Sequence, residues 1–368
     1  MRNLKKNIIV LIMITLLVLS MYKVFKIINN KELVGSIEII TNEENYVYLK
    51  DSAEKFMSAN KKSKINVTKN NKDEMIEYLN KASNVENEIN LMMLDSKTLR
   101  SINEDSLENI SYQDNIIDSY SKNFNSWRLN EVKKGEHYLG IPIQSNPQFL
   151  IIREDILNQY GYKSEDIRSW NELIDLYKDI DSKSNNEISL FSYDLTTIEE
   201  IEKIIIYQGG NINQAEEITN IIKDDNLMGK ETPLGYIADK NNYKNIINNN
   251  LKNSLKAIMI PAIVVGGNRA VSFDGDNIVA LKSEYERQDV ANRFLRFLID
   301  NQNLISVDTL NNEGFFPSSR AFYNNIVVDK EFEEINNQKV LSIMTNIVNR
   351  VPDTTDYDRI DDILDVRK

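Results

Sequence analysis

The residue types that most often do covalent chemistry are scarce in this chain of 368 residues. It has one histidine, His137, in the polar stretch KKGEHYLG, and no cysteine. The standard loops for activated nucleophiles, phosphates and hydrolytic metals are missing, so His137 is more simply a solvent-exposed loop residue than a catalytic base. The 56 carboxylates are too numerous for any pair to indicate glycosidase chemistry. We therefore expect no catalytic residue, no metal site, no cofactor and no enzyme activity.

Two turns, one polar and one with paired glycines, are the candidates for a binding function. The sequence QSNP at residues 144–147 separates two apolar runs, and such a turn can present hydrogen-bonding groups where the chain passes between domains. The pair Gly266-Gly267 lacks the further glycine or lysine of a phosphate-binding loop, so a simple turn is its plainest interpretation. A polar solute needs amide and carboxylate groups for its hydroxyls and flat aromatic faces for its CH surfaces, and the chain has both.

Strand and helix patterns alternate along the chain, which is typical of an α/β fold. In the first part we expect three parallel strands in one sheet, at residues 37–40, 65–68 and 90–94, with a helix at 73–81. Asn42 is expected to cap a helix with a buried stripe formed by Tyr46, Leu49, Ala53 and Phe56.

A second part is expected to follow the 144–147 turn, with a strand at 149–152 and a helix from Arg153. Ser169 and Glu172 predict a capping box at the start of the next helix. Further elements are a strand at 188–193, a helix from Thr197 to the Gly209-Gly210 pair, a loop or frayed helix at 245–253, and helices at 331–349 and 356–365. Ala257–Val265 is predicted to be a buried strand that returns the chain to the first part, and 311–317 a third crossing.

The N-terminus predicts attachment to a membrane. Three basic residues precede an apolar run from Ile8 to Tyr22, which is short for a spanning helix of about 17–25 residues and resembles an export signal. We expect an uncleaved signal anchor with residues from about Lys31 onward outside the cell, and cleavage after Ser20 is the alternative left open. A net charge of −12 opposes binding to nucleic acid.

The order of these segments resembles the extracellular solute-binding proteins of ABC importers, the sugar-binding, maltose-binding-protein-like family. The crossover GIPIQSNPQ at 140–148 is similar to the run that leads from one lobe of these proteins into the other. Five further segments resemble the family in the same order: SIEIITNEENYVYLKDSAEKF at 36–56, SWNEL at 169–173, IYQGGN at 206–211, DVANRFLRFL at 289–298 and GFFPSSRAFY at 314–323.

The resemblance implies a two-lobed periplasmic-binding-protein-like (type II) α/β fold with a hinge and an interlobe cleft, preceded by the N-terminal hydrophobic helix. It implies lobe boundaries at 35–141 plus 262–312 for the first lobe and 142–261 plus 313–368 for the second, after a tether at 1–30. It also implies a ligand-binding set in the cleft: Asn42, Glu43, Asp95, Ser145, Asn146, Tyr193, Tyr207, Gln208, Gly266, Gly267 and Phe315.

The implied function is to bind a small polar solute, with a carbohydrate favoured, and to deliver it as a monomer to ABC permease subunits. A rival interpretation is a degenerate member of the fold that acts as a sensor or interaction subunit at the cell surface. It starts from the missing lipid-attachment cysteine, from a short stretch between Gly210 and Gly229, and from Tyr236 as a loose match to an expected aromatic.

Overall fold

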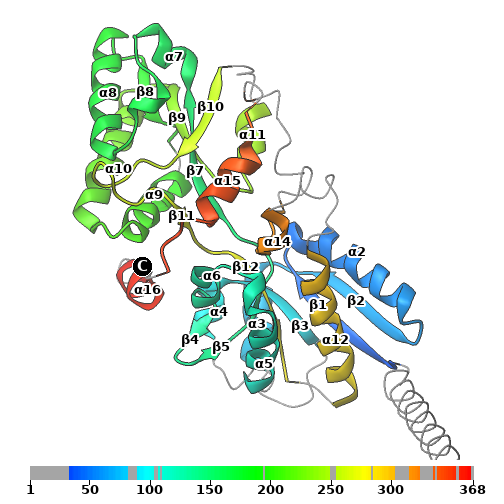
Figure 1. The fold of residues 1–368 in the computed structure, drawn as a ribbon. Helices are drawn as coiled ribbons and strands as arrows, with labels where there is room; N and C mark the ends of the chain where they lie inside the picture. The colour runs from blue at the N-terminus through cyan, green and yellow to red at the C-terminus, as the bar shows by residue number, and fades with distance from the viewer. Residues whose placement is uncertain are drawn as a thin grey trace, which may run out of the picture.

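The computed structural model of the chain describes residues 33–81, 89–102, 107, 110–193, 195–248, 254–282, 285–302, 315–323, 335, 338–353 and 356–365. These residues form two α/β lobes, each built on its own sheet, and the chain passes between them at a narrow waist (Figure 1). Among them no helix is long and apolar enough to cross a membrane. The predicted signal anchor at 8–22 lies outside the described residues.

The first lobe is built on a five-stranded sheet with the order β2-β1-β3-β12-β6. As predicted, its first three strands are parallel neighbours, whereas β12 runs antiparallel to β3 and to β6. The strands are β1 (Gly35–Thr41), β2 (Ser63–Lys69), β3 (Ile89–Asp95), β6 (Ile141–Pro142) and β12 (Asp276–Ala280).

Helices cover both faces of this sheet, and each face has its own apolar core. One core joins the sheet to α2 (Glu43–Ala59), α5 (Ile110–Tyr120) and α12 (Tyr285–Asn301). The other joins it to α3 (Lys72–Lys81) and α4 (Ser96–Ser101). A short helix α6 (Ser126–Asn130), the turn η2 (Ser121–Asn123) and the hairpin β4 (Lys133–Lys134) and β5 (His137–Tyr138) complete the lobe.

The second lobe is built on the sheet β10-β7-β9-β8, to which β11 adds through β7. Its strands are β7 (Pro147–Arg153), β8 (Ile188–Phe191), β9 (Thr232–Ala238), β10 (Leu255–Met259) and β11 (Val271–Ser272). One face packs on α7 (Glu154–Gln159), the turn η3 (Ser164–Asp166), α8 (Trp170–Lys183), α9 (Leu195–Tyr207) and α10 (Ile212–Leu227). The other face packs on α11 (Tyr243–Asn248), α14 (Arg320–Tyr323) and α15 (Val340–Val348).

Local sequence signals placed several of these elements correctly, whereas β9, β12, α4, α5, α6 and α10 were not predicted. Asn42 caps α2 by accepting from the backbone N–H of Asn45, and Ser169 with Glu172 forms the expected capping box of α8. The turn after α9 has Gly209 at a φ of +84°, in the left-handed region where glycine is favoured. Tyr46 was wrongly included in the buried stripe of α2, because Tyr48 and Asn45 are buried instead.

The predicted strand at 257–265 is wrong beyond Met259. Strand β10 ends there and pairs with β7 in the second sheet, and Pro261 follows without extending the strand. Val264 and Val265 are exposed, so this segment is a surface turn of the second lobe. The chain returns to the first lobe later, between β11, which pairs with β7, and β12, which pairs with β3.

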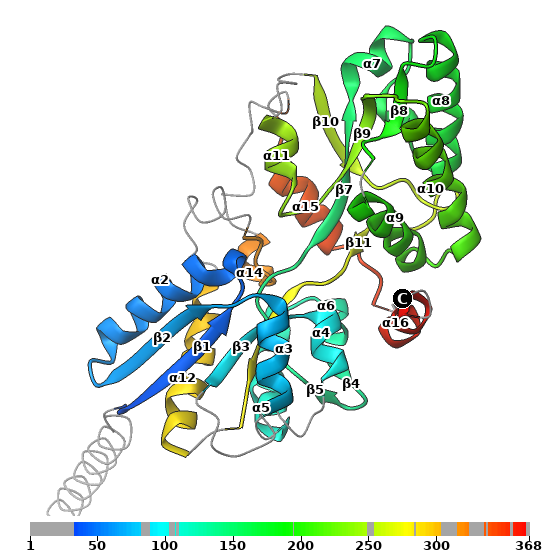
Figure 2. The same ribbon diagram turned by 180° about the vertical axis from the view of Figure 1, so that it is seen from behind.

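Two C-terminal helices close the described chain. Helix α15 begins at Val340, later than the predicted start at Glu331, while residues 331–334 lie outside the described part. The predicted helix at 356–365 is confirmed as α16 (Tyr357–Asp365). Both views place α16 beside the waist, between α9 of the second lobe and α4 and α6 of the first (Figures 1 and 2).

Candidate functional site

Three passages of the chain meet at the waist and are hydrogen-bonded to one another. The backbone N–H groups of Ile143 and Gln144 donate to the carbonyl of Asp276 at 3.0 and 3.1 Å. Ser145 donates its N–H to the carbonyl of Phe316 at 2.9 Å, in the third passage. The predicted crossings near Ser145 and Pro317 therefore lie side by side, together with the segment that leads into β12.

The side chain of Arg128 joins the same three passages from inside the protein. Its guanidinium donates to the carbonyls of Gln144 and Asp276 at 2.9 and 3.0 Å and to Ser318 Oγ at 3.2 Å. The residue is only 1% exposed, so these bonds form where carbonyl groups have no water to replace a lost donor. Helix α6 thus holds the passages at fixed positions relative to each other.

A cavity of about 440 Å³, lined mainly by polar residues, lies over the ends of β1, β2 and β3, next to this waist. The carboxyl ends of neighbouring parallel strands are where α/β proteins place ligands, because loops and helix N-termini converge there. Its polar lining comes from the ends of these three strands, the starts of the helices that follow them, and the start of β12: Asn42, Glu43, Glu44, Lys69, Asn70, Asn71, Lys72, Glu74, Asp95, Thr98 and Asp276.

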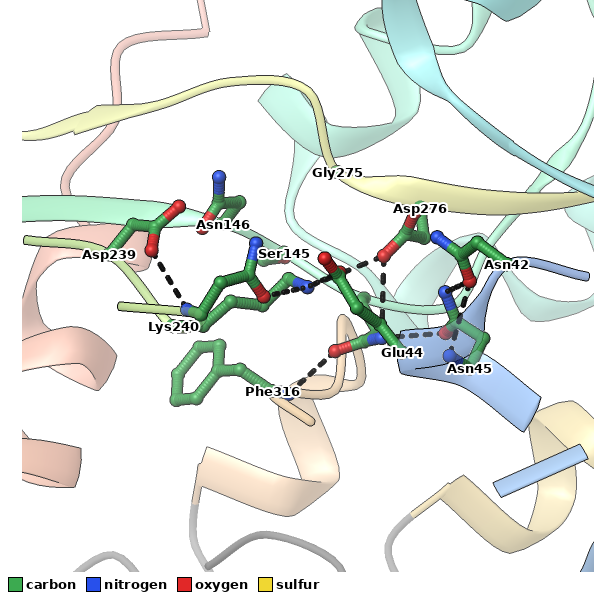
Figure 3. A network of polar contacts seen from close by, with 12 residues as sticks. Asn42, Glu44, Asn45, Ser145, Asn146, Asp239, Lys240, Gly275, Asp276 and Phe316 are labelled. Atoms are coloured by element: carbon green, nitrogen blue, oxygen red, sulfur yellow. Dashed lines mark hydrogen bonds and ion pairs between the residues drawn. The ribbon is translucent and has the colours of Figure 1, made fainter. Parts of the chain in front are cut away.

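A lysine of the second lobe reaches across to this cavity. Lys240, just after β9, places its Nζ 3.2 Å from a carboxylate oxygen of Glu44 and 3.4 Å from Asp276 Oδ2 (Figure 3). Glu44 is at the start of α2 and Asp276 at the start of β12, so this ammonium bridges the two sheets. The Lys240 side chain is only 3% exposed.

Gln144 links this bridge to the cap of α2. Its Nε2 donates to Asn45 Oδ1 at 2.6 Å and to Asp276 Oδ2 at 3.3 Å, and its Oε1 accepts from the N–H of Phe316 at 2.9 Å. Asn45 in turn donates to Asn42 Oδ1 at 2.7 Å. A continuous polar network therefore connects the first crossing, the third crossing and the wall of the cavity (Figure 3).

Neighbouring charges, rather than burial, determine the charge states of Lys240 and Asp95 beside the cavity. Burial alone would lower the pKa of Lys240, but Asp276, Glu44 and Asp239 together raise it above the ordinary lysine value. Burial likewise opposes the charge on Asp95, yet Lys72 at 2.9 Å and the N-terminal groups of α4 lower its pKa. Lys240 is accordingly an ammonium and Asp95 a carboxylate at neutral pH.

A second, smaller cavity of about 260 Å³ lies between the end of α9 and the C-terminal helix α16. Tyr207 and Gln208 line it, but both also have structural roles. The Tyr207 ring packs on Phe273 and Tyr357, with centroids 4.9 and 6.0 Å away, and Gln208 Oε1 accepts from the indole N–H of Trp170 at 2.9 Å. This second cavity is a junction between α9 and α16, away from Lys240.

The structure brings together only part of the predicted ligand set. Asn42, Glu43 and Asp95 line the larger cavity, so these three predicted residues lie together. Ser145 and Asn146 lie at the crossing beside it (Figure 3), and Ser145 Oγ hydrogen-bonds Ser318 Oγ at 3.2 Å. Asn146 is 7% exposed, and its Oδ1 has no hydrogen-bond partner among the described residues.

The remaining predicted residues lie elsewhere. Phe315 is 1% exposed in the core of the first lobe, with its ring tilted against that of Tyr48 at a centroid distance of 4.2 Å, and it lines neither cavity. Gly266 and Gly267 form the exposed turn after β10, where Gly267 donates its N–H to the Val264 carbonyl, and they line neither cavity. Tyr193 is 42% exposed after β8 and also lines neither.

Sequence reasoning missed the charged residues that connect the lobes. Glu44 adjoins a nominated residue, and Asp276 follows a glycine at the start of a strand, so both could have been added from position alone. Lys240 gave no comparable signal, because it stands in a polar run, DKNN, that is typical of a surface loop. Tyr236 does not replace the expected cleft aromatic, since it lies on β9 and packs against the second lobe's core.

Comparison with known proteins places the fold. No family model matches the sequence, and no curated protein does. Among solved structures, the sugar-binding protein MalE of Xanthomonas citri matches with a TM-score of 0.68 at 14% identity, over 90% of this chain and 91% of that one. The galacto-N-biose-/lacto-N-biose I-binding protein of a Bifidobacterium longum ABC transporter matches with a TM-score of 0.65 at 14% identity, over 87% and 86%.

A maltose-bound MalE3 of T. maritima is similar as well, with a TM-score of 0.61 and 15% identity over 89% of this chain and 92% of that chain. These neighbours confirm the resemblance to sugar-binding solute receptors that the sequence motifs indicate, at the level of fold. Their low identities leave the individual contacts of the cavity to be argued from this chain's own residues.

Proposed function

We propose that this protein is an extracellular solute-binding protein that delivers a small polar solute, with a carbohydrate favoured, to an ABC permease. The observation that carries the proposal is the polar cavity at the ends of β1 and β3, bridged to the second lobe by Lys240. A solute gripped by both lobes shifts the population toward the closed state by the free energy of its extra contacts there. The likeness to sugar-binding receptors supports the same conclusion.

The proposed lobes are residues 35–141 plus 262–312 and residues 142–261 plus 313–368. The proposed return to the first lobe is at residue 262. Because β11 still pairs with β7 of the second lobe, we favour moving this boundary to the segment between β11 and Asp276. Three passages at the waist then act together as the hinge, and the interlobe cleft opens between Lys240 and the walls around Glu44. The protein works as a monomer, because one chain contributes both walls.

The proposed location is the outer face of the cell membrane, with residues 8–22 as an uncleaved anchor. The basic residues before this apolar run favour an inside position for the N-terminus. N-terminal sequencing of the protein recovered from the cell surface tests this arrangement. An intact N-terminus supports the anchor, whereas a mature protein that begins at Met21 or later contradicts it.

Two measurements on the full-length protein test the binding function. Calorimetric titration with mono- and oligosaccharides, polyamines and amino acids should find a solute that binds at one site per chain. Small-angle scattering should then report a smaller radius of gyration with the solute than without it. A complete lack of binding across the panel would count against a transport role.

One observation favours the rival, a sensor or interaction subunit at the cell surface. No aromatic residue lines the larger cavity among the described residues, although flat aromatic faces are the usual partners of sugar CH surfaces. Under this alternative the protein binds a membrane partner rather than feeding a permease. Co-purification of the intact protein from its native membrane distinguishes the two, since permease and ATPase subunits are expected only for transport.

A further inference from the structure

The larger cavity has the composition of a site for positive charge. Its described lining includes five carboxylates, from Glu43, Glu44, Glu74, Asp95 and Asp276, against the two lysines Lys69 and Lys72. Those lysines are already paired, Lys69 with Glu43 at 2.6 Å and Lys72 with Asp95 at 2.9 Å. The carboxylates nearest the waist therefore depend on another source of positive charge.

That source is a primary ammonium supplied by the protein itself. Lys240 Nζ lies between Glu44 and Asp276 and also donates to Asn241 Oδ1 at 2.9 Å. Asp239 adds a third carboxylate on the same side, and its oxygen is held by the N–H groups of Asn241 and Asn242. An ammonium has three donors and no acceptor, so this cluster of acceptors matches its chemistry.

An unused acceptor beside this cluster points in the same direction. The Oδ1 of Asn146 has no hydrogen-bond partner in the described part of the chain, although the residue is 7% exposed, and leaving a buried acceptor unpaired is unfavourable. Asn146 follows Ser145 at the first crossing, and Figure 3 draws it in the same view as Asp239 and Lys240. Lys240 thus leaves an acceptor unsatisfied that a ligand with additional N–H or O–H donors could use.

We propose that the solute carries a protonated primary amine, which binds at the Glu44–Asp276 pair in place of the Lys240 ammonium. This inference rests on the proposed solute-binding function and names the chemical class of its ligand. Amino sugars and polyamines both present such an amine, and a hydroxylated amino sugar also fits the amide-rich lining of Asn42, Asn70 and Asn71. Lys240 is then the internal competitor of the solute and a determinant of its specificity.

Calorimetry on the full-length protein with matched sugars tests the ammonium directly. Glucosamine and glucose differ only in the group on C2, and N-acetylglucosamine carries the same nitrogen in an uncharged, larger acetamide, so only glucosamine is a cation at neutral pH. We expect glucosamine or, as a separate arm, spermidine to bind about tenfold or more tightly than both neutral sugars, and to weaken with added salt. Equal or tighter binding of a neutral sugar overturns the inference and leaves solute binding standing, whereas no binding in any arm removes both.

Replacing Lys240 tests whether its ammonium competes with the solute, because a purely structural lysine would not weaken amine binding when present. Lys240→Met should tighten binding of the amine by about tenfold, because the solute no longer displaces a bound cation. Lys203→Met is the matched control. Lys203 pairs at 2.9 Å with Asp274, which lies in the passage that leads to Asp276, but neither residue lines the cavity. We expect this substitution to leave the affinity for the amine unchanged. Weaker amine binding in a folded Lys240→Met protein contradicts the proposal.

If Lys240→Met does not fold, Glu44→Gln still tests whether the amine binds at the Glu44–Asp276 pair. The Glu44 side chain is 44% exposed, so its replacement is tolerable for folding, and it removes one of the two carboxylates proposed to hold the amine. We expect about a tenfold loss of amine affinity, a larger loss than for any neutral sugar, because only the amine loses a charge partner. An unchanged amine affinity would show that the ammonium binds elsewhere or not at all.

Discussion

Arg128 and Glu131 form an ion pair of 3.0 Å in which each side chain is 1% exposed. The two residues are separated by about one helical turn at the end of α6, and the same guanidinium holds the three passages of the waist. Burial raises the pKa of Glu131, and the nearby Arg128 and Arg100 act against that shift. Arg128 therefore fixes the geometry of the waist and, together with Arg100, balances the charge of Glu131.

Arg128→Met is expected to destabilise the fold by about 3–5 kcal/mol, because it leaves a carboxylate and several carbonyl groups buried without their donor. Arg168→Met is the control, since Arg168 is 60% exposed in its i,i+4 pair with Glu172 and should cost at most about 1 kcal/mol. Urea unfolding of both variants measures the difference. Similar stabilities for the two would contradict the role of Arg128 as the centre of the waist.

Gly275→Ala tests how tightly the passages are packed around the same guanidinium. A Cβ at this position would lie 2.6 Å from the Gln144 carbonyl oxygen and 2.8 Å from Arg128 Nη2, so one of them must move. We expect a loss of about 1–3 kcal/mol, as for other overpacked sites, and a lower melting temperature.

Gly161→Ala separates this steric effect from backbone strain. Gly161 has a φ of +82° with no atom within 4 Å of the added Cβ, so only about 1 kcal/mol of conformational strain is expected there. A Gly275→Ala protein as stable as the wild type would mean that the passages move apart easily.

The parts of the fold that depend on local sequence could be predicted, and those that depend on contacts distant in sequence could not. Asn42 as a cap and Gly209 as a helix end follow from side-chain and backbone preferences within a few residues. The end of β10 at Met259 does not, because the apolar residues beyond Pro261 look like a strand until the pairing with β7 is known. The C-terminal end of β10 is therefore set by its pairing with β7 and not by the local composition.

The candidate site has the same limit. Asn42 and Asp95 were nominated by resemblance at the ends of the first and third strands, and both line one cavity. Lys240 and Glu44 are 196 positions apart, and nothing in either local sequence indicates that they meet. Phe315 was assigned to the ligand by resemblance, but its packing on Tyr48 makes it core.

Asp361→Asn should loosen helix α16 without unfolding either lobe. Asp361 accepts from Arg100 at 2.6 and 2.8 Å, and the Arg100 guanidinium lies 5.2 Å from the Tyr357 ring, so this pair fastens the helix to α4. Loss of the charge is expected to cost about 1–3 kcal/mol, the usual value for a hydrogen bond to a charged group. Hydrogen exchange should become faster in 357–365 and stay unchanged in β1, whereas equal protection would contradict the role of the pair.

Asp95→Asn should flatten the acid limb of the stability curve. The carboxylate accepts from Thr98 N–H at 2.8 Å and pairs with Lys72, so the folded-state pKa lies below its ordinary value of 3.8. A depressed carboxyl pKa means that the unfolded state binds the proton more readily; the contribution of Asp95 is therefore complete above the ordinary value and disappears as pH falls through the folded one. Urea unfolding from neutral pH down to about pH 3 measures the slope, which should be smaller in the variant. An identical slope would mean that the charge of Asp95 does not stabilise the start of α4.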